Sequence, residues 1–111
     1  MNTCYFAKYR NKLNGISIAL FPPHYFKGQC YPLLAPSYEL LRDFKNKLIT
    51  DQQYKTMYLE LLNTRKLTGQ KVLLDIGNDA VLLCYEKKED FCHRHIVSEW
   101  LRSQNIDCLE L

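Results

Sequence analysis

The sequence has no long hydrophobic run and only a small excess of charge. No stretch of its 111 residues approaches the roughly 20 apolar residues of a membrane-spanning helix. The first residues, MNTCYFAKYRNK, lack the apolar core of a secretion signal. The net charge of +3 at pH 7 is too small to indicate nucleic-acid binding by itself. These absences predict a cytoplasmic globular protein with no membrane partner.

The cysteines show no spacing that is typical of a metal site or a disulfide framework. There are five of them, namely Cys4, Cys30, Cys84, Cys92 and Cys108. Because the chain has neither a Cys-x2-Cys pair nor a His-Glu-x-x-His motif, no metal site and no cofactor is assigned. The side chains that could donate to a metal are Cys84, Cys92, His93 and His24. In a reducing cytoplasm the cysteines are expected to be free thiols.

Glycine and proline are scarce, and all four prolines lie between positions 22 and 36. This segment predicts a long irregular loop, and such loops in compact domains are often functional. Gly28 permits close approach to the backbone, Lys27 can bind a phosphate, and Tyr25 or Phe26 can stack on a base. His24 precedes them as a further candidate for ligand binding. Packing of aromatic rings that hold the loop together is the alternative explanation.

Elsewhere the apolar pattern alternates between strands and helices. Strands are predicted at 3–9, 16–21, 80–85 and 106–109. Helices are predicted at 38–48, after a Thr50–Gln53 capping box, at 68–76 and at 92–104. Thr68 would cap the helix at 68–76, and Gly77 would end it in a left-handed conformation. The continuous apolar run from Ala80 is typical of a strand buried on both faces of a parallel sheet. We therefore predict one α/β domain over 1–111, with a mainly parallel sheet flanked by helices in a Rossmann-like, three-layer arrangement. The last two strands and the helix between them would form one right-handed crossover unit.

The segment CYEKKEDFCHRH, residues 84–95, concentrates the reactive side chains. It lies between the apolar strand and the last helix, and open α/β sheets bind ligands at such strand ends. With Asp90 as the N-cap, Cys92 would lie in the first helical turn, where the helix dipole favours a thiolate nucleophile. His93 and Glu86 are candidates for proton transfer.

Two interpretations remain open for the basic residues of this segment. Arg94 could bind a phosphate or carboxylate, or it could pair with Glu86 or Asp90 and order the loop. His93 lies on the inward side of the helix, either as a buried hydrogen-bonded residue or as a site residue, whereas His95 is expected to face solvent.

The positions of two loops predict a shared anion site. Lys27 and Arg94 both follow a predicted strand by a short connection, and such loops in a parallel sheet open at the same edge. We therefore expect the two cations to converge on one anion. Tyr85 lies at the same strand end and is expected to contact the ligand.

The sequence LLCYEKKEDFCHRHIVSEWL resembles the C-terminal signature of the domain of unknown function 488 family. In that family a strand ends in Cys, here Cys84, a Glu follows two residues later, here Glu86, and Cys-His-Arg opens a helix. IALFPPHYFKG and LAPSY resemble the proline–aromatic loop of its short members. Phe21-Pro22-Pro23 stands where longer members have Asp-x-Arg. The family has no assigned biochemical function, so the resemblance supports the fold and the site and leaves the reaction open.

Together these features predict a small cytoplasmic enzyme or sensor that acts on a phosphate-bearing ligand, either a nucleotide or a nucleic-acid end. The expected catalytic residues are Cys92, His93 and Glu86. The expected ligand-binding residues are Arg94, Lys27, His24, Tyr25, Gly28 and Tyr85. The alternatives are a non-catalytic binding module of a bacterium or phage, which would sequester a nucleotide or engage a partner protein, and a metal-dependent hydrolase.

Overall fold

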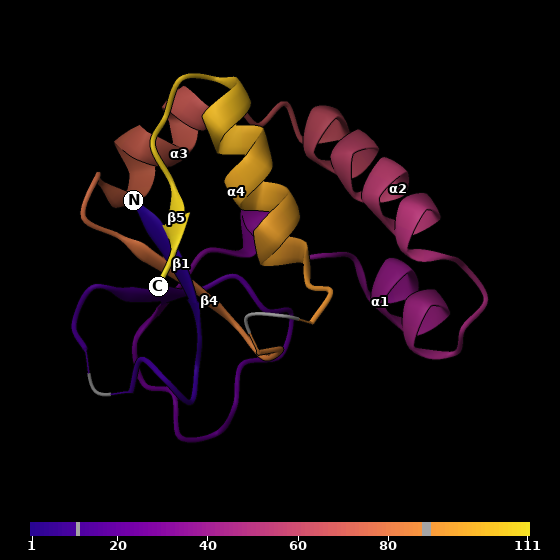
Figure 1. Cartoon of the computed structure of the whole chain (residues 1–111), viewed down its shortest axis with the longest axis horizontal. Helices are drawn as coiled ribbons and strands as arrows, with labels where there is room; N and C mark the ends of the chain where they lie inside the picture. Colours follow the sequence, from indigo (N-terminus) through magenta and orange to yellow (C-terminus); the bar gives the residue numbers. More distant parts are fainter. Residues whose placement is uncertain (11, 88–89) are drawn as a thin grey trace.

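The computed structural model describes residues 1–10, 12–87 and 90–111. In chain order, its elements are β1 (Asn2–Tyr5), β2 (Gly15–Ser17), β3 (Gln29–Cys30), the 3-10 helix η1 (Pro32–Leu34), α1 (Tyr38–Lys45), α2 (Asp51–Thr64), α3 (Gly69–Ile76), β4 (Val81–Cys84), α4 (His93–Ser103) and β5 (Leu109–Glu110) (Figure 1). No helix in the described part of the chain is both long and apolar enough to span a membrane.

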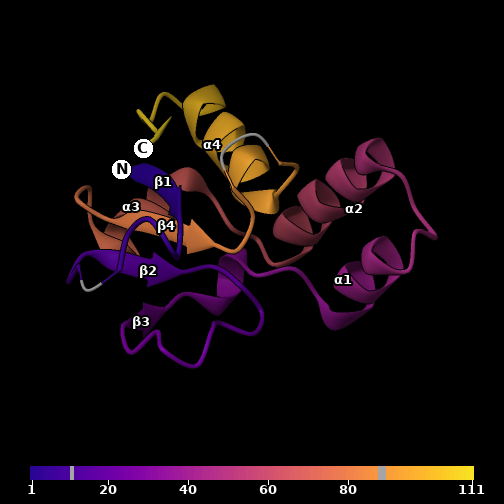
Figure 2. The same ribbon diagram turned by 60° about the horizontal axis from the view of Figure 1, so that its bottom comes forward.

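The five strands form one parallel sheet in the order β3-β2-β4-β1-β5. The predicted α/β domain, with a parallel sheet flanked by helices, is confirmed, as is the central place of strand 80–85. The last strand pairs with β1 and not with β4, so the connection through α4 passes over one strand. Figure 2 shows α4 above the sheet and the α1–α2 pair beside it.

β4 is the central strand of the sheet, and its four side chains are buried alternately on the two faces. Leu82 and Cys84 belong to the core cluster that also includes side chains of all four α-helices. Val81 and Leu83 belong to a second cluster on the opposite face, together with Cys4. None of the four β4 residues is more than 2% exposed. This two-sided burial is what the uninterrupted apolar run predicts.

Several elements are shorter than the apolar pattern predicts. After Tyr5 the chain leaves the ladder in consecutive turns, in which the amide of Lys8 donates to the carbonyl of Tyr5. The first helix ends at Lys45 because Lys47 adopts a positive φ of 59°. The second strand covers only 15–17, the last strand covers only 109–110, and β3 was not predicted. Hydrophobic periodicity therefore overestimated the lengths of these strands and of the first helix.

The helix caps agree with the sequence signals. The Thr50 amide donates to Gln53 Oε1 at 2.8 Å, and the Gln53 amide donates to Thr50 Oγ1 at 3.1 Å, which completes the predicted capping box. Thr68 caps α3 by accepting from the Lys71 amide at 3.1 Å. Gly77 ends α3 with a positive φ of 84°, as expected, but its ψ of 165° lies outside the left-handed helical region.

We expect Thr50→Ala to lower the free energy of unfolding by about 1 kcal/mol, because the substitution leaves a helix amide without its acceptor. Urea denaturation measures the loss. Thr56→Ala is the matched control, since Thr56 is exposed within α2 and makes no cap. Equal losses in the two variants would contradict a specific role for the capping box.

Candidate functional site

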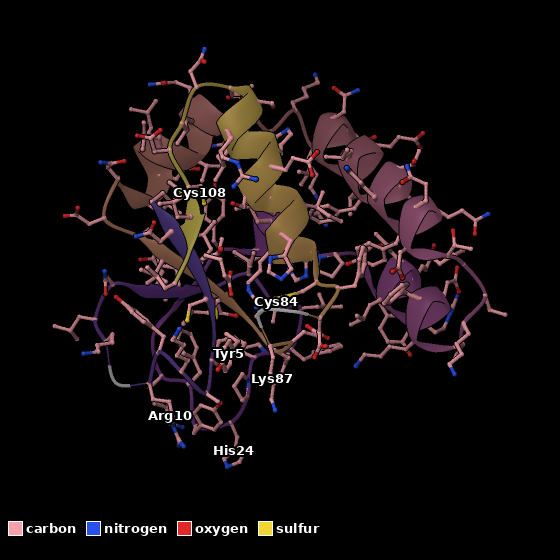
Figure 3. The ribbon with its side chains drawn as sticks, in the orientation of Figure 1. Tyr5, Arg10, His24, Cys84, Lys87 and Cys108 are labelled. Atoms are coloured by element: carbon pink, nitrogen blue, oxygen red, sulfur yellow. A yellow bond between two sulfur atoms is a disulfide. The ribbon has the colours of Figure 1, made fainter. Side chains whose placement is uncertain are left out.

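The reactive residues gather where β4 ends and α4 begins, at the carboxyl end of the sheet. Figure 3 shows Cys84 beneath the first turn of α4. The N-cap of α4 is Cys92, with extended φ and ψ of −153° and 148°, and it makes no side-chain cap bond. The prediction that Asp90 is the N-cap is wrong: the helix begins later, and Asp90 is exposed.

A disulfide joins Cys84 to Cys92 across the end of β4. The two residues are 1% and 4% exposed, and their Cα atoms lie 7.5 Å apart. The expectation of free thiols is therefore wrong for this pair, although Cys4, Cys30 and Cys108 are free. A nucleophilic role for Cys92 requires the bond to be reduced first, because the thiolate is the reactive form.

His93 is held between the sheet and the helix by a hydrogen bond to the end of β2. Its Nε2 lies 2.7 Å from the Ile18 carbonyl oxygen, which can only accept, so Nε2 carries the ring hydrogen. The unprotonated Nδ1 therefore faces Cys92 Sγ at 3.8 Å. Burial lowers the pKa of His93 to about 4, so the ring is neutral at neutral pH. His93 is therefore a buried, hydrogen-bonded residue, and it also lines the cavity described below.

Cys84, Cys92 and His93 form a compact group that we term the Cys–Cys–His cluster. One donor atom from each, the two sulfurs and a ring nitrogen, lies within 4.8 Å of the other two. Such a group could hold a metal ion if its sulfurs were reduced. His24, the fourth donor considered from the sequence, is not part of the group; it lies on the exposed 22–28 loop near Arg10 (Figure 3).

Arg94 supports the cluster from inside the protein. Its side chain is completely buried, and its Nη2 donates to Glu110 Oε2 at 2.9 Å. Its Nη1 donates to Cys84 Sγ at 3.1 Å. The predicted pairing with Glu86 or Asp90 is therefore wrong, because the partner is Glu110 of β5. A guanidinium that is buried and occupied in this way is not available to the ligand anion that the sequence assigned to it.

Glu110 was missed by sequence reasoning, since it lies 16 residues from Arg94 on another element. Thr3 Oγ1 also donates to this carboxylate, at 2.6 Å. Burial by itself would raise the pKa of Glu110, but the hydrogen bonds from Arg94 and Thr3 bring it below its usual value. His95 Nδ1 lies 4.0 Å from the same carboxylate, so His95 is not the solvent-facing bystander that its helical position predicted. The signal that the sequence offered for this partner was the charged side chain of Glu110 in the last strand.

A cavity of about 370 Å³ opens beside the cluster. Cys84, Cys92 and His93 line it, and its aromatic walls are Phe21, Phe44, Tyr54, Tyr85 and Phe91. Among the residues that the structure describes, Glu86 and Lys45 are the charged ones that line it, and Glu86 Oε2 lies 4.0 Å from Cys84 Sγ. Tyr85 is fixed by a hydrogen bond from its hydroxyl to the Phe21 carbonyl. The predicted catalytic residues and Tyr85 are therefore together.

The other predicted ligand-binding residues lie elsewhere. Lys27, Tyr25 and Gly28 line a second cavity of about 350 Å³, in which Arg10 lies over the Tyr25 ring at 4.1 Å. The structure thus does not bring Lys27 and Arg94 together at one anion site, as the sequence led us to expect. The reason is topological. Lys27 comes just before β3, which runs parallel to β2, so the loop has by then returned to the edge of the sheet where both strands begin.

Comparisons with curated proteins and with solved structures find no match. A comparison with protein-family models does find one. The model DUF488-N3a, described as the active DUF488-N3 subclade, matches residues 4–105. Since the match covers nearly the whole described domain, this chain belongs to the domain of unknown function 488 family.

Proposed function

We propose that this protein is a small cytoplasmic enzyme that acts on a nucleotide-like ligand, meaning a flat heteroaromatic ring system that carries phosphate. The ligand would occupy the cavity beside the Cys–Cys–His cluster. The observation that carries the proposal is the presence of two sulfurs and an imidazole in a cavity whose walls are largely aromatic. Ligand sites are typically apolar concavities with a few convergent polar groups.

The cavity offers a distinct contact for each part of such a ligand. The aromatic walls can stack on a heterocycle. Lys45 lines the same cavity, and α4 begins beside it, so a phosphate would meet an ammonium group and the positive end of a helix. Lys45 therefore takes the role that the sequence gave to Arg94.

The catalytic roles follow from the protonation state of each residue. A pKa of about 4 makes His93 a weak proton acceptor at neutral pH. Glu86 is exposed at the cavity and is the better candidate for proton transfer. The sulfurs would act only after reduction of the Cys84–Cys92 bond.

Binding of nucleotides to the reduced protein tests the proposal. We expect Lys45→Ala to weaken nucleotide binding about 10- to 100-fold, the loss of one charge-assisted contact, and to leave nucleoside binding unchanged. Titration calorimetry measures both. Lys27→Ala is the matched control, because Lys27 lines the other cavity. If Lys27→Ala weakens binding and Lys45→Ala does not, the ligand lies in the second cavity and the proposal is wrong.

Turnover separates an enzyme from a binding module. We expect the reduced wild-type protein to convert a bound nucleotide, and Glu86→Gln to bind the nucleotide without converting it. Chromatography and mass spectrometry of the incubated nucleotides detect the product. Binding without turnover by the wild-type protein would support the non-catalytic module instead, and the absence of any nucleotide or nucleoside binding would reject both.

A further inference from the structure

We propose that Cys84, Cys92 and His93 bind a zinc ion once the Cys84–Cys92 bond is reduced. Two thiolates and one imidazole would be the protein ligands, and the fourth position would face the cavity. The inference rests on the proposed function in one respect only: the zinc ion would be the group that carries out the chemistry of the proposed enzyme. Metal binding itself is measured without any nucleotide, so either proposal can fail alone.

The donor atoms can reach the required spacing once the Cys84–Cys92 bond is reduced. Zinc binds sulfur at about 2.3 Å and nitrogen at about 2.0 Å in tetrahedral sites, which places the donors on the order of 3.5–4 Å apart. Cys92 Sγ and His93 Nδ1 are 3.8 Å apart, and all three donors lie within 4.8 Å of one another. The Cα atoms of the two cysteines are 7.5 Å apart, wider than the usual range of about 4.4–6.8 Å for disulfides, so the reduced sulfurs have room for an ion between them.

His93 is oriented as a metal ligand would be. Its Nε2–H donates to the Ile18 carbonyl at 2.7 Å, which fixes the ring and leaves the lone pair of Nδ1 directed at the sulfurs. Histidines that bind metals commonly donate their other ring N–H to a carbonyl or carboxylate, and this contact sets both tautomer and orientation. The backbone at the end of β2 thus supplies the outer contact.

The local charges also suit zinc. Two thiolates neutralise Zn²⁺, and Arg94 Nη1 donates to Cys84 Sγ at 3.1 Å, which stabilises a thiolate there. The Arg94 charge is in turn balanced by Glu110. Binding involves no oxidation or reduction: Zn²⁺ replaces one proton on each thiol, and two protons are released. The disulfide must first take two electrons from a phosphine or dithiol reductant, which is itself oxidised.

The open fourth position indicates a reaction class. Structural zinc sites are closed by four protein ligands, whereas catalytic sites keep one position for water or substrate. Glu86 Oε2, at 4.0 Å from Cys84 Sγ, is close enough to accept a proton from a water molecule bound there. The expected reaction is therefore metal-assisted hydrolysis of the ligand, in which Cys92 binds the metal and is not a nucleophile.

Metal content and cobalt spectroscopy test the site. We expect the reduced wild-type protein, purified without chelators, to bind one zinc ion per chain, as measured by atomic emission. Added Co²⁺ should produce a sulfur-to-cobalt charge-transfer band in the near ultraviolet. Cys84→Ser, Cys92→Ser and His93→Asn should each lose bound zinc, and the two serine variants should weaken the cobalt band. Cys30→Ser is the matched control, because Cys30 is exposed and free, and should keep full zinc binding.

A second measurement needs no substitution and so remains decisive if a variant fails to fold. In the reduced wild-type protein, zinc should slow alkylation of Cys84 and Cys92 by iodoacetamide and leave Cys30 unaffected, as peptide mapping would show. The proposal is overturned if the reduced wild-type protein neither binds zinc nor gains this protection, or if folded Cys84→Ser retains full zinc binding. Nucleotide binding that persists in a protein without zinc affinity would reject the metal site alone.

Discussion

Arg94→Met is expected to lower the free energy of unfolding by about 3–5 kcal/mol, the typical cost of removing one partner from a buried ion pair. The Arg94 side chain is fully buried, and the Glu110 side chain is only 12% exposed. Methionine fills much of the same volume but cannot donate to Glu110 or to Cys84 Sγ. The loss therefore comes mainly from a carboxylate left without its cation in a poorly solvated place, and not from a packing defect.

Two further variants of the oxidised protein isolate that cause in urea denaturation. Arg42→Met removes an exposed ion pair with Asp43 at 3.1 Å and should cost at most about 1 kcal/mol. Combining Arg94→Met with Glu110→Leu should cost less than Arg94→Met alone, since no unpaired charge remains. If Arg94→Met proves no more destabilising than Arg42→Met, the pair is not the internal support that its burial indicates.

The oxidised, metal-free protein is expected to lose stability through His93 as the pH falls from about 6.5 to about 4. The pKa of His93 is lowered in the folded state to about 4, so the unfolded chain binds this proton at a higher pH than the folded one. The contribution of His93 is therefore fully present above the unfolded pKa of about 6.5 and falls as the pH decreases toward the folded value. A shift of this size corresponds to about 3 kcal/mol when complete.

His93→Gln identifies the source of the pH dependence, because the glutamine amide can still donate to the Ile18 carbonyl but does not titrate. Denaturant midpoints measured across this pH range should fall less steeply for the variant than for the wild-type protein. Glu110, whose pKa is also lowered, adds an acid-induced loss of its own, but it is present in both proteins and cancels in the difference. His24→Gln is the control at an exposed histidine, and identical slopes in wild-type and His93→Gln protein would contradict the prediction.

Local features of this protein were predictable from the sequence. The apolar run of β4 identified the central strand, because burial on both faces requires apolar side chains at every position. The Thr50–Gln53 capping box and the Thr68 cap involve residues three apart along the chain, so their geometry follows as soon as a helix begins there. The position of Cys92 and His93 at a helix start beside a strand end was also predictable, because neighbouring residues in the sequence define that junction.

The chemistry of the site was decided by contacts between residues that are distant in sequence. Glu110, rather than Glu86 or Asp90, pairs with Arg94 because β5 lies beside β1 in the sheet. Lys27 lies at another cavity because β3 runs parallel to β2 and requires the loop to return to the start of that strand.

Hydrophobic periodicity and capping depend on neighbours within a turn or a strand, and therefore the sequence by itself determined the α/β class, the central strand and the helix starts marked by Thr50 and Thr68. Strand order and loop return depend on the packing of the whole sheet, which no local pattern encodes. Only the tertiary structure therefore decided that the sulfurs of Cys84 and Cys92 meet and that His93 turns Nδ1 toward Cys92 Sγ. It also decided that Arg94 is buried and binds Glu110 and Cys84 Sγ, so that its guanidinium is not available to a ligand.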